Sequence, residues 1–151
     1  IIERVLGDVE KKKIKAGRAF SDAGMAEITE LHQHLVGNLR LGMSVFLNGN
    51  LQDARTLLEQ KTRFRDMELA YAANHITRLS DNTLQSIETS SLHLDMISEL
   101  KRINSHIASI AYPILETAGA LEPSRLRQTQ PAQITPTDAA LVNNKTSNTA
   151  K

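Results

Sequence analysis

The sequence predicts an all-α protein, an antiparallel three-helix bundle with an extra N-terminal helix and a disordered C-terminal tail. In residues 92–116 apolar side chains recur at alternating intervals of four and three, which is the spacing of a bundle helix. Two turn-forming segments, 48–50 and 80–83, divide the chain before it into pieces of helical length. Turns this short force successive helices to run antiparallel. The regularly spaced residues are Met96, Leu100, Ile103, Ile107, Ile110 and Ile114.

Residues 1–17 are predicted to form a basic amphipathic linker helix. Their apolar side chains fall on one helical face, and four lysines follow within residues 11–15. The lysines are equally consistent with a solvated helix end and, if a membrane domain precedes them, with attraction to anionic lipid at the cytoplasmic leaflet. The apolar positions are Ile2, Val5, Leu6 and Val9.

The first bundle helix should begin at Ser21, because serine is a good N-cap and Asp22 suits the positive end of a helix. Gly37 and Gly42 lie inside this helix, and each should cost about 1 kcal/mol relative to alanine. Close approach of a neighbouring helix and plain tolerance explain these glycines equally well. The apolar stripe consists of Ile28, Leu31, Leu35, Leu39 and Phe46.

The second bundle helix should begin at Asn50, after Gly49 has ended the first one, and run to about Leu79. Its core-facing side is predicted to be partly ionic. Three apolar positions, Leu57, Phe64 and Tyr71, alternate along this face with Lys61, Glu68 and His75, and Arg65 lies beside them.

The third bundle helix is predicted over residues 84–118. Thr89–Ser91 are weak helix formers and should mark a bend, and Pro113 should kink the last turns because it cannot bond back to Ser109. The stretch 120–151 is rich in Thr, Gln, Asn and Pro and poor in large apolar residues, so we expect a disordered tail. The bundle itself should span 18–119.

The second and third helices should bring their polar side chains together in a partly buried network. Buried charges must be paired, so we expect Arg102 to hold the surrounding carboxylates and to set the helix register. A functional interpretation, in which the cluster senses an ion or contacts a partner, remains open. The candidate residues are Lys61, Arg65, Glu68, His75, His93, Asp95, Glu99, Arg102, Asn104 and His106.

Four segments in one order, RFRDME, NHITRL, SSLHLD and LKRINSHI, carry a resemblance to a known family. Over roughly residues 18–116 the chain resembles the PhoU-like, spectrin-repeat-like cytoplasmic domain of bacterial sodium/phosphate cotransporters. The resemblance implies a regulatory domain in phosphate transport and homeostasis, on the cytoplasmic face of the bacterial inner membrane and within an integral membrane protein. Its partner would be a sodium/phosphate transport domain of the same chain. Since the sequence opens on Ile1, we expect that domain upstream.

The resemblance also raises the question of a metal site, because PhoU-like bundles commonly carry acidic metal motifs. Arg102, Ile103 and His106 match the core of such a motif, but Lys101 and Ser105 occupy its acid positions. An ammonium group cannot bind a metal, and a hydroxyl does not replace a carboxylate for a hard cation. The weaker candidates are Glu68 with His75 and Asp95 with Glu99. No cofactor is expected.

Composition and motifs exclude several classes of function. The segment 21–116 holds eight basic and twelve acidic side chains, and the chain has three Phe, two Tyr and no Trp, which argues against nucleic-acid binding. No window approaches the run of about 20 apolar residues that spans a bilayer. There is no Cys, phosphate loop or HExxH pair, so we expect a protein without catalytic activity.

Two functions therefore compete. The first is the regulatory domain of a sodium-dependent phosphate transporter, and the alternative is a stand-alone PhoU-like metal-binding or phosphate-signalling adaptor. The reading frame upstream of Ile1 separates them, because several hydrophobic spans support the first and a nearby start codon supports the second. Whether the domain forms a homodimer is left open.

Overall fold

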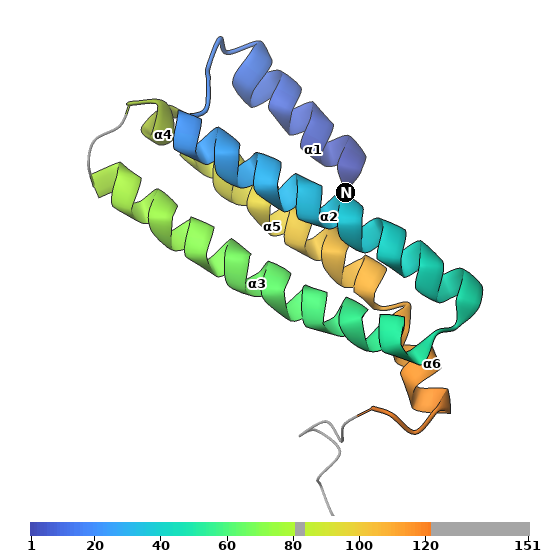
Figure 1. The fold of residues 1–151 in the computed structure, drawn as a ribbon. Helices are drawn as coiled ribbons and strands as arrows, with labels where there is room; N and C mark the ends of the chain where they lie inside the picture. Colours follow the sequence, from blue (N-terminus) through green and yellow to red (C-terminus); the bar gives the residue numbers. More distant parts are fainter. Residues whose placement is uncertain (81–83, 122–151) are drawn as a thin grey trace, which may run out of the picture. The chain divides into compact units, whose positions relative to one another are not determined.

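The computed structural model describes residues 1–80 and 84–121. Most of these residues are helical and none of them forms a strand, so the predicted all-α bundle is confirmed (Figure 1). The predicted tail lies outside the described residues except for positions 120 and 121. The elements are α1 (Ile2–Val9), a π-helical turn η1 (Glu10–Ile14), α2 (Asp22–Asn48), α3 (Leu51–Ser80), α4 (Leu84–Glu88), α5 (Ser90–Ala108) and α6 (Ala111–Thr117).

The caps of α2 and α3 are those that the sequence predicts. The Ser21 hydroxyl accepts a hydrogen bond from the Gly24 N–H at 3.2 Å and satisfies one of the free donors at the start of α2. Gly49 ends α2 in the left-handed conformation, with φ of 62°. The Asn50 side chain then accepts from the N–H groups of Gln52 and Asp53 at 2.8 and 3.1 Å.

The third rod of the bundle is divided into α4, α5 and α6. The first break falls at Thr89, where φ is −108° and ψ is 7°, inside the predicted bend. The second break falls at Ser109 and Ile110, one turn before Pro113. Proline has no N–H to offer the Ser109 carbonyl, which accepts instead from the Tyr112 N–H at 3.3 Å. Both interruptions therefore have a local cause in the sequence.

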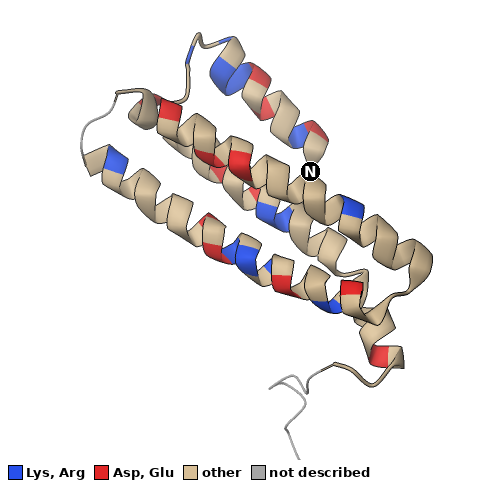
Figure 2. Ribbon diagram, viewed as in Figure 1, with Lys and Arg blue, Asp and Glu red and all other residues tan. Residues whose placement is uncertain are grey.

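Helices α2, α3 and α5 form the three-helix bundle, and apolar side chains fill its interior in two clusters. The first lies along the middle of the bundle and the second at the end that contains the α2–α3 turn. The middle cluster consists of Ile28, Leu31, Leu35, Phe64 and Ile97. The end cluster consists of Val45, Ala54, Leu57, Ala108, Ala111 and Leu115. Charged residues of both signs are concentrated along the middle of α3 and α5 (Figure 2).

Gly37 and Gly42, the two glycines in the middle and later turns of α2, differ in their surroundings. A Cβ on Gly42 would lie 2.9 Å from Cγ2 of Ile107, so this glycine permits the close approach of α2 and α5. A Cβ on Gly37 would meet no atom within 4 Å. Each of the two explanations left open by the sequence thus holds at one glycine.

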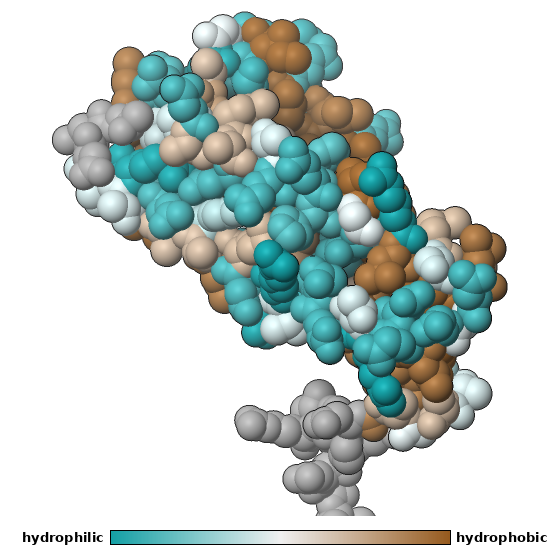
Figure 3. Space-filling model, in the orientation of Figure 1, coloured by the Kyte–Doolittle hydropathy of each residue, from teal (hydrophilic) through white to brown (hydrophobic). Residues whose placement is uncertain are grey.

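The N-terminal helix α1 lies beside α2 and α5. Arg4 pairs with Glu99, and Lys12 Nζ lies 3.3 Å from Asp95 Oδ2. An apolar groove of about 740 Å³ has its lining on α1, α2 and α5. Apolar surface gathers over α1 and at the end with the α2–α3 turn (Figure 3). No helix within the described ranges combines the length and the hydropathy that a membrane crossing needs.

Candidate functional site

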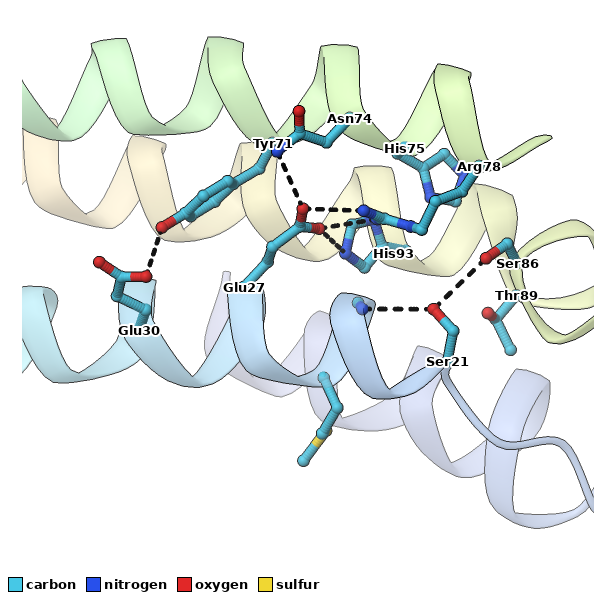
Figure 4. Close-up of polar contacts among 12 residues, drawn as sticks. Ser21, Glu27, Glu30, Tyr71, Asn74, His75, Arg78, Ser86, Thr89 and His93 are labelled. Atoms are coloured by element: carbon cyan, nitrogen blue, oxygen red, sulfur yellow. Dashed lines mark hydrogen bonds and ion pairs between the residues drawn. The ribbon is translucent and has the colours of Figure 1, made fainter. Parts of the chain in front are cut away.

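A buried ion pair joins α2 to α3 at the end of the bundle where α2 begins. Arg78 Nη1 donates to Glu27 Oε1 at 2.9 Å, and Nη2 donates to Oε2 at 2.7 Å (Figure 4). The two side chains are only 16% and 10% exposed. Two parallel charge-assisted bonds fix both the distance and the orientation of the helices. We call the surrounding set the Glu27 cluster, which comprises Glu27, Asn74, His75, Arg78, Ser90 and His93.

Two imidazoles extend this cluster to α5. His93 Nε2 lies 3.2 Å from Glu27 Oε2, and the His93 ring stacks on that of His75 with centroids 4.7 Å apart. His75 Nε2 in turn lies 2.9 Å from Ser90 Oγ. The His93 ring packs against the first turn of α2, where a Cβ on Gly24 would lie 3.3 Å from His93 Cδ2. A side chain at position 24 would therefore crowd the ring.

Burial lowers the pKa of both imidazoles, because a charged ring would lose its hydration. Repulsion from Arg78 further lowers the pKa of His75, and repulsion from His75 lowers that of His93. Attraction to Glu27 opposes these effects at both rings but is smaller than desolvation. The two rings are thus neutral at pH 7, and the charge of the cluster is that of the Glu27–Arg78 pair.

The sequence prediction missed Glu27 and Arg78, although the helical spacing of each residue could have indicated that it faces the bundle interior. Arg78 lies three residues after His75 and continues the partly ionic face of α3 by one more step. Glu27 lies four residues before Leu31 and so begins the apolar stripe of α2. An antiparallel α2–α3 hairpin brings these two positions to the same level of the bundle.

The Arg102-centred network that the sequence predicts is wrong in its geometry. The Arg102 side chain is 60% exposed, and its nearest acid is Glu99 on the preceding turn, at 3.8 Å. Lys101 instead reaches the buried Glu68, with Nζ 2.9 Å from Oε1. Successive residues differ by about 100° around a helix, so a shift of one position separates Lys101, which is 38% exposed and reaches Glu68, from Arg102, which is 60% exposed. His106 is exposed as well.

The remaining predicted residues fall into separate contacts. Asp95 is 55% exposed and Glu99 is 13% exposed, and both face the N-terminal segment. Asn104 is buried and accepts a hydrogen bond from Asn38 Nδ2 at 2.8 Å, which links α5 to α2. The structure thus brings together His75 with His93 and Glu68 with Lys101. It places Asp95, Glu99 and Asn104 elsewhere along α5.

Lys61 and Arg65 lie on α3 near α6. Lys61 Nζ donates to the Tyr112 hydroxyl at 2.9 Å and sits 5.2 Å from the centre of its ring. Arg65 is exposed and pairs with the adjacent Asp66 at 3.3 Å. These two residues therefore belong to the surface between α3 and α6 rather than to the buried network.

The weak metal candidates do not converge. Glu68 bonds Lys101 and His75 bonds Ser90, while Asp95 and Glu99 pair with cations of the N-terminal segment. Within residues 1–80 and 84–121, no group of three or more His, Cys, Asp or Glu side chains is placed to hold a metal ion. What the described arrangement does is cross-link three helices through polar contacts at several levels.

Comparisons with known proteins agree with the predicted resemblance. The sequence matches the PhoU domain over residues 28–114. It is 45% identical over 116 residues to a Salmonella typhimurium protein named "Putative inorganic phosphate export protein YjbB" and 43% identical to proteins of the same name from Escherichia coli K12 and Shigella flexneri. Each match covers 77% of this chain and 21% of the relative. No solved structure shows significant similarity.

The chain thus spans about a fifth of the length of these relatives. The matched family region begins in the second turn of α2 and ends within α6, so it includes most of α2 and all of α3 and α5. The Glu27 cluster lies at the border of this region, with Glu27 one residue before it. From the family match and these relatives together, the chain belongs to the PhoU domain family.

Proposed function

We propose that this chain is the regulatory domain of a longer membrane protein that transports inorganic phosphate, and that it acts without catalytic activity of its own. The observation that carries the proposal is the 45% identity to a relative whose name denotes phosphate export and of which the chain spans 21%. Most of such a relative's length remains for a transport domain. Regulation would take place at the cytoplasmic face of the bacterial inner membrane.

The bundle is suited to transmit a displacement along its length. Polar contacts join its helices at three levels, through Glu27 and Arg78, through Glu68 and Lys101, and through Asn38 and Asn104. Because partly satisfied buried polar groups are costly, these contacts resist the sliding of one helix past another. A movement imposed at one end of the bundle would therefore reach the other end.

The N-terminal helix is the proposed connection to the transport domain. Two ion pairs join the N-terminal segment to the bundle, Arg4–Glu99 from α1 and Lys12–Asp95 from η1, and their cations are 57% and 39% exposed. The Lys12–Asp95 pair, in which both side chains are exposed, contributes only about 0–1 kcal/mol, whereas Glu99 in the other pair is 13% exposed. Because both cations remain in contact with water, the N-terminal segment can change its position more easily than the bundle helices can, as a coupling element requires.

Phosphate flux in the full-length protein tests this proposal. The protein would be reconstituted in vesicles with and without residues 18–116, and uptake and release of labelled phosphate would be measured over a range of phosphate concentrations. Each direction would be measured with and without a sodium gradient, because the resemblance to sodium/phosphate cotransporters leads us to propose that the transport depends on sodium. Equal amounts of inserted protein provide the control.

Regulation predicts that the deleted protein still transports phosphate but with an altered dependence on phosphate concentration. Identical kinetics for the two proteins would reduce the domain to a structural appendage. A flux that ignores the sodium gradient in both proteins would remove sodium coupling from the proposal and leave the regulatory role in place.

A further inference from the structure

Three cationic side chains meet at one surface pocket between α3, α5 and α6. The pocket has a volume of about 490 Å³, and none of the residues that line it is acidic. Leu58 supplies apolar lining, and the remaining lining side chains carry cationic or hydroxyl groups. These are Lys61, Thr62, Arg65, Lys101, Ser105 and Tyr112. We call this the Lys61 pocket.

The positions of these residues follow from helical spacing. Lys61 and Arg65 are four apart on α3, and Lys101 and Ser105 are four apart on α5, so each pair presents its side chains on one helical face. The two faces oppose each other across the α3–α5 contact, and Tyr112 of α6 completes the lining. Groups distant in sequence are thus collected in one depression.

Two of the cations are held in place by the protein. The Tyr112 hydroxyl accepts from Lys61 Nζ at 2.9 Å, and Glu68 Oε1 accepts from Lys101 Nζ at 2.9 Å. The acceptor for Lys61 is a hydroxyl and not a carboxylate, so this contact brings no acidic group to the ammonium. Cations that are already positioned lose less conformational entropy when a ligand binds.

The charge balance leaves the pocket attractive to an anion. The charge of Lys101 is offset by Glu68. Asp66 lies 3.3 Å from Arg65, but Asp66 and Arg65 are 61% and 62% exposed and form a weak surface pair. An arriving oxyanion can therefore compete for the Arg65 guanidinium, which binds such groups with two parallel hydrogen bonds. Lys61 has no acidic partner among its contacts in the described residues.

We propose that the Lys61 pocket binds a phosphate group, with Lys61 and Arg65 as its principal cationic contacts. The geometry points to an oxyanion, and the choice of phosphate among oxyanions rests on the proposed function. The pocket is larger than a single phosphate ion needs, so free inorganic phosphate and the phosphate of a lipid headgroup present the same chemistry to it.

Titration of the 151-residue chain with inorganic phosphate tests the site. Calorimetry would give the affinity, and backbone amide NMR shifts would locate the binding. A parallel arm would measure sedimentation with vesicles of phosphatidylcholine alone and with added phosphatidylglycerol. We expect saturable binding in one arm, with amide shifts centred on Lys61, Arg65 and Ser105. The arm that shows it identifies the source of the phosphate group.

A matched pair of double variants assigns the binding to the pocket. Lys61→Gln with Arg65→Gln should weaken it by about tenfold or more, because two charge-assisted contacts are lost. Arg55→Gln with Arg63→Gln removes the same charge from exposed positions of α3 outside the pocket and should change it by less than about twofold. Thermal melts of both variants confirm that each is folded.

The proposal is overturned if neither probe binds saturably, if the amide shifts lie elsewhere, or if the two double variants weaken binding equally. These outcomes are separate from a failure of the proposed function. A chain that binds no phosphate, in a protein whose flux still changes when residues 18–116 are removed, refutes the pocket alone. A bound phosphate with unaltered flux refutes the regulatory role alone.

Discussion

The two ends of this bundle are held together by different kinds of interaction. At the end with the α2–α3 turn, small and branched apolar side chains such as Val45, Ala54 and Leu57 are completely buried, each with 0% exposure. At the opposite end the same three rods meet through Glu27, Arg78 and the stacked imidazoles of His75 and His93. One end therefore depends on volume and the other on charge and protonation.

This difference shows how one fold can combine tolerance with specificity. Apolar packing accepts any side chain of suitable volume, whereas a buried bidentate ion pair accepts very few replacements. The end cluster itself consists of apolar residues, so its packing does not change with pH. The Glu27 cluster therefore makes the opposite end of the bundle less tolerant of side-chain replacement and more sensitive to pH.

The largest effect should come from breaking the buried pair. Glu27→Ala leaves the Arg78 guanidinium buried without its partner and should lower the free energy of unfolding by about 3–5 kcal/mol. Urea denaturation followed by circular dichroism measures this loss. Glu30→Ala, which removes an exposed glutamate one turn away with a 2.6 Å bond to Tyr71, should cost less than about 1 kcal/mol.

A second variant separates the cost of an orphaned charge from that of lost packing. Glu27→Met combined with Arg78→Met should recover most of the stability lost by Glu27→Ala, because no buried charge remains unpaired. A double variant that is less stable than Glu27→Ala would show that the two charges themselves stabilise this end, and that removing both costs more than leaving one unpaired.

Acidification should weaken the polar end next. The lowered pKa of His75 and of His93 means that the folded protein holds these rings neutral while the unfolded chain protonates them near pH 6.5. Their contribution is complete above that value and is lost as pH falls from 6.5 toward the folded-state pKa, by at most about 1.4 kcal/mol per pH unit for each ring. Urea melts between pH 7.5 and 5 measure this slope.

Replacement of one buried ring identifies the source of the slope. His93→Gln should flatten the dependence in this pH range, whereas His106→Gln, at an exposed position, should leave it unchanged. Equal slopes for the unaltered chain and for His93→Gln would assign the acid sensitivity to other groups and remove the predicted difference between the two ends.

A smaller effect is expected where the apolar end is tightly packed. Gly42→Ala brings a Cβ to 2.9 Å from Ile107 Cγ2, and the overpacking should exceed the gain in helix propensity by about 1 kcal/mol. Gly37→Ala meets open space and should stabilise the protein by up to about 1 kcal/mol. Thermal melts compare the two. A stabilising Gly42→Ala would show that α2 and α5 can separate freely.

The smallest effect should follow from Arg102→Ala. A buried network around Arg102 would require a loss of about 3–5 kcal/mol, but the side chain is 60% exposed, so we expect less than about 0.5 kcal/mol. Lys101→Ala, which leaves the buried Glu68 without its cation, should cost more in the same denaturation assay. The reverse order would restore Arg102 as the central cation of α5.

Most of the helix ends and interruptions could be predicted from the sequence. Ser21, Gly49 and Asn50 act locally, so the ends of α2 and the start of α3 follow from neighbouring residues. Pro113 likewise interrupts the last rod through its own missing N–H. Local causes of this kind need no knowledge of the rest of the molecule.

The polar contacts could be predicted only in part. The sequence shows that α3 and α5 carry charged residues near their core-facing sides, and Glu68, His75, His93 and Asn104 are indeed buried. It does not show which residue each of them meets. Partner choice depends on helix rotation and axial offset. Lys101 rather than Arg102 therefore reaches Glu68, and Glu27 meets both Arg78 of α3 and His93 of α5.

The sequence by itself determined that this chain is a three-helix bundle of the PhoU family, with its turns, caps and apolar stripes in place. Those features depend on periodicity and on interactions within a few residues. Only the tertiary structure decided that Glu27, Arg78, His75 and His93 come together at one end, and that Lys61, Arg65 and Lys101 line one pocket. Contacts between helices are set by the packing of whole faces, which no single segment encodes.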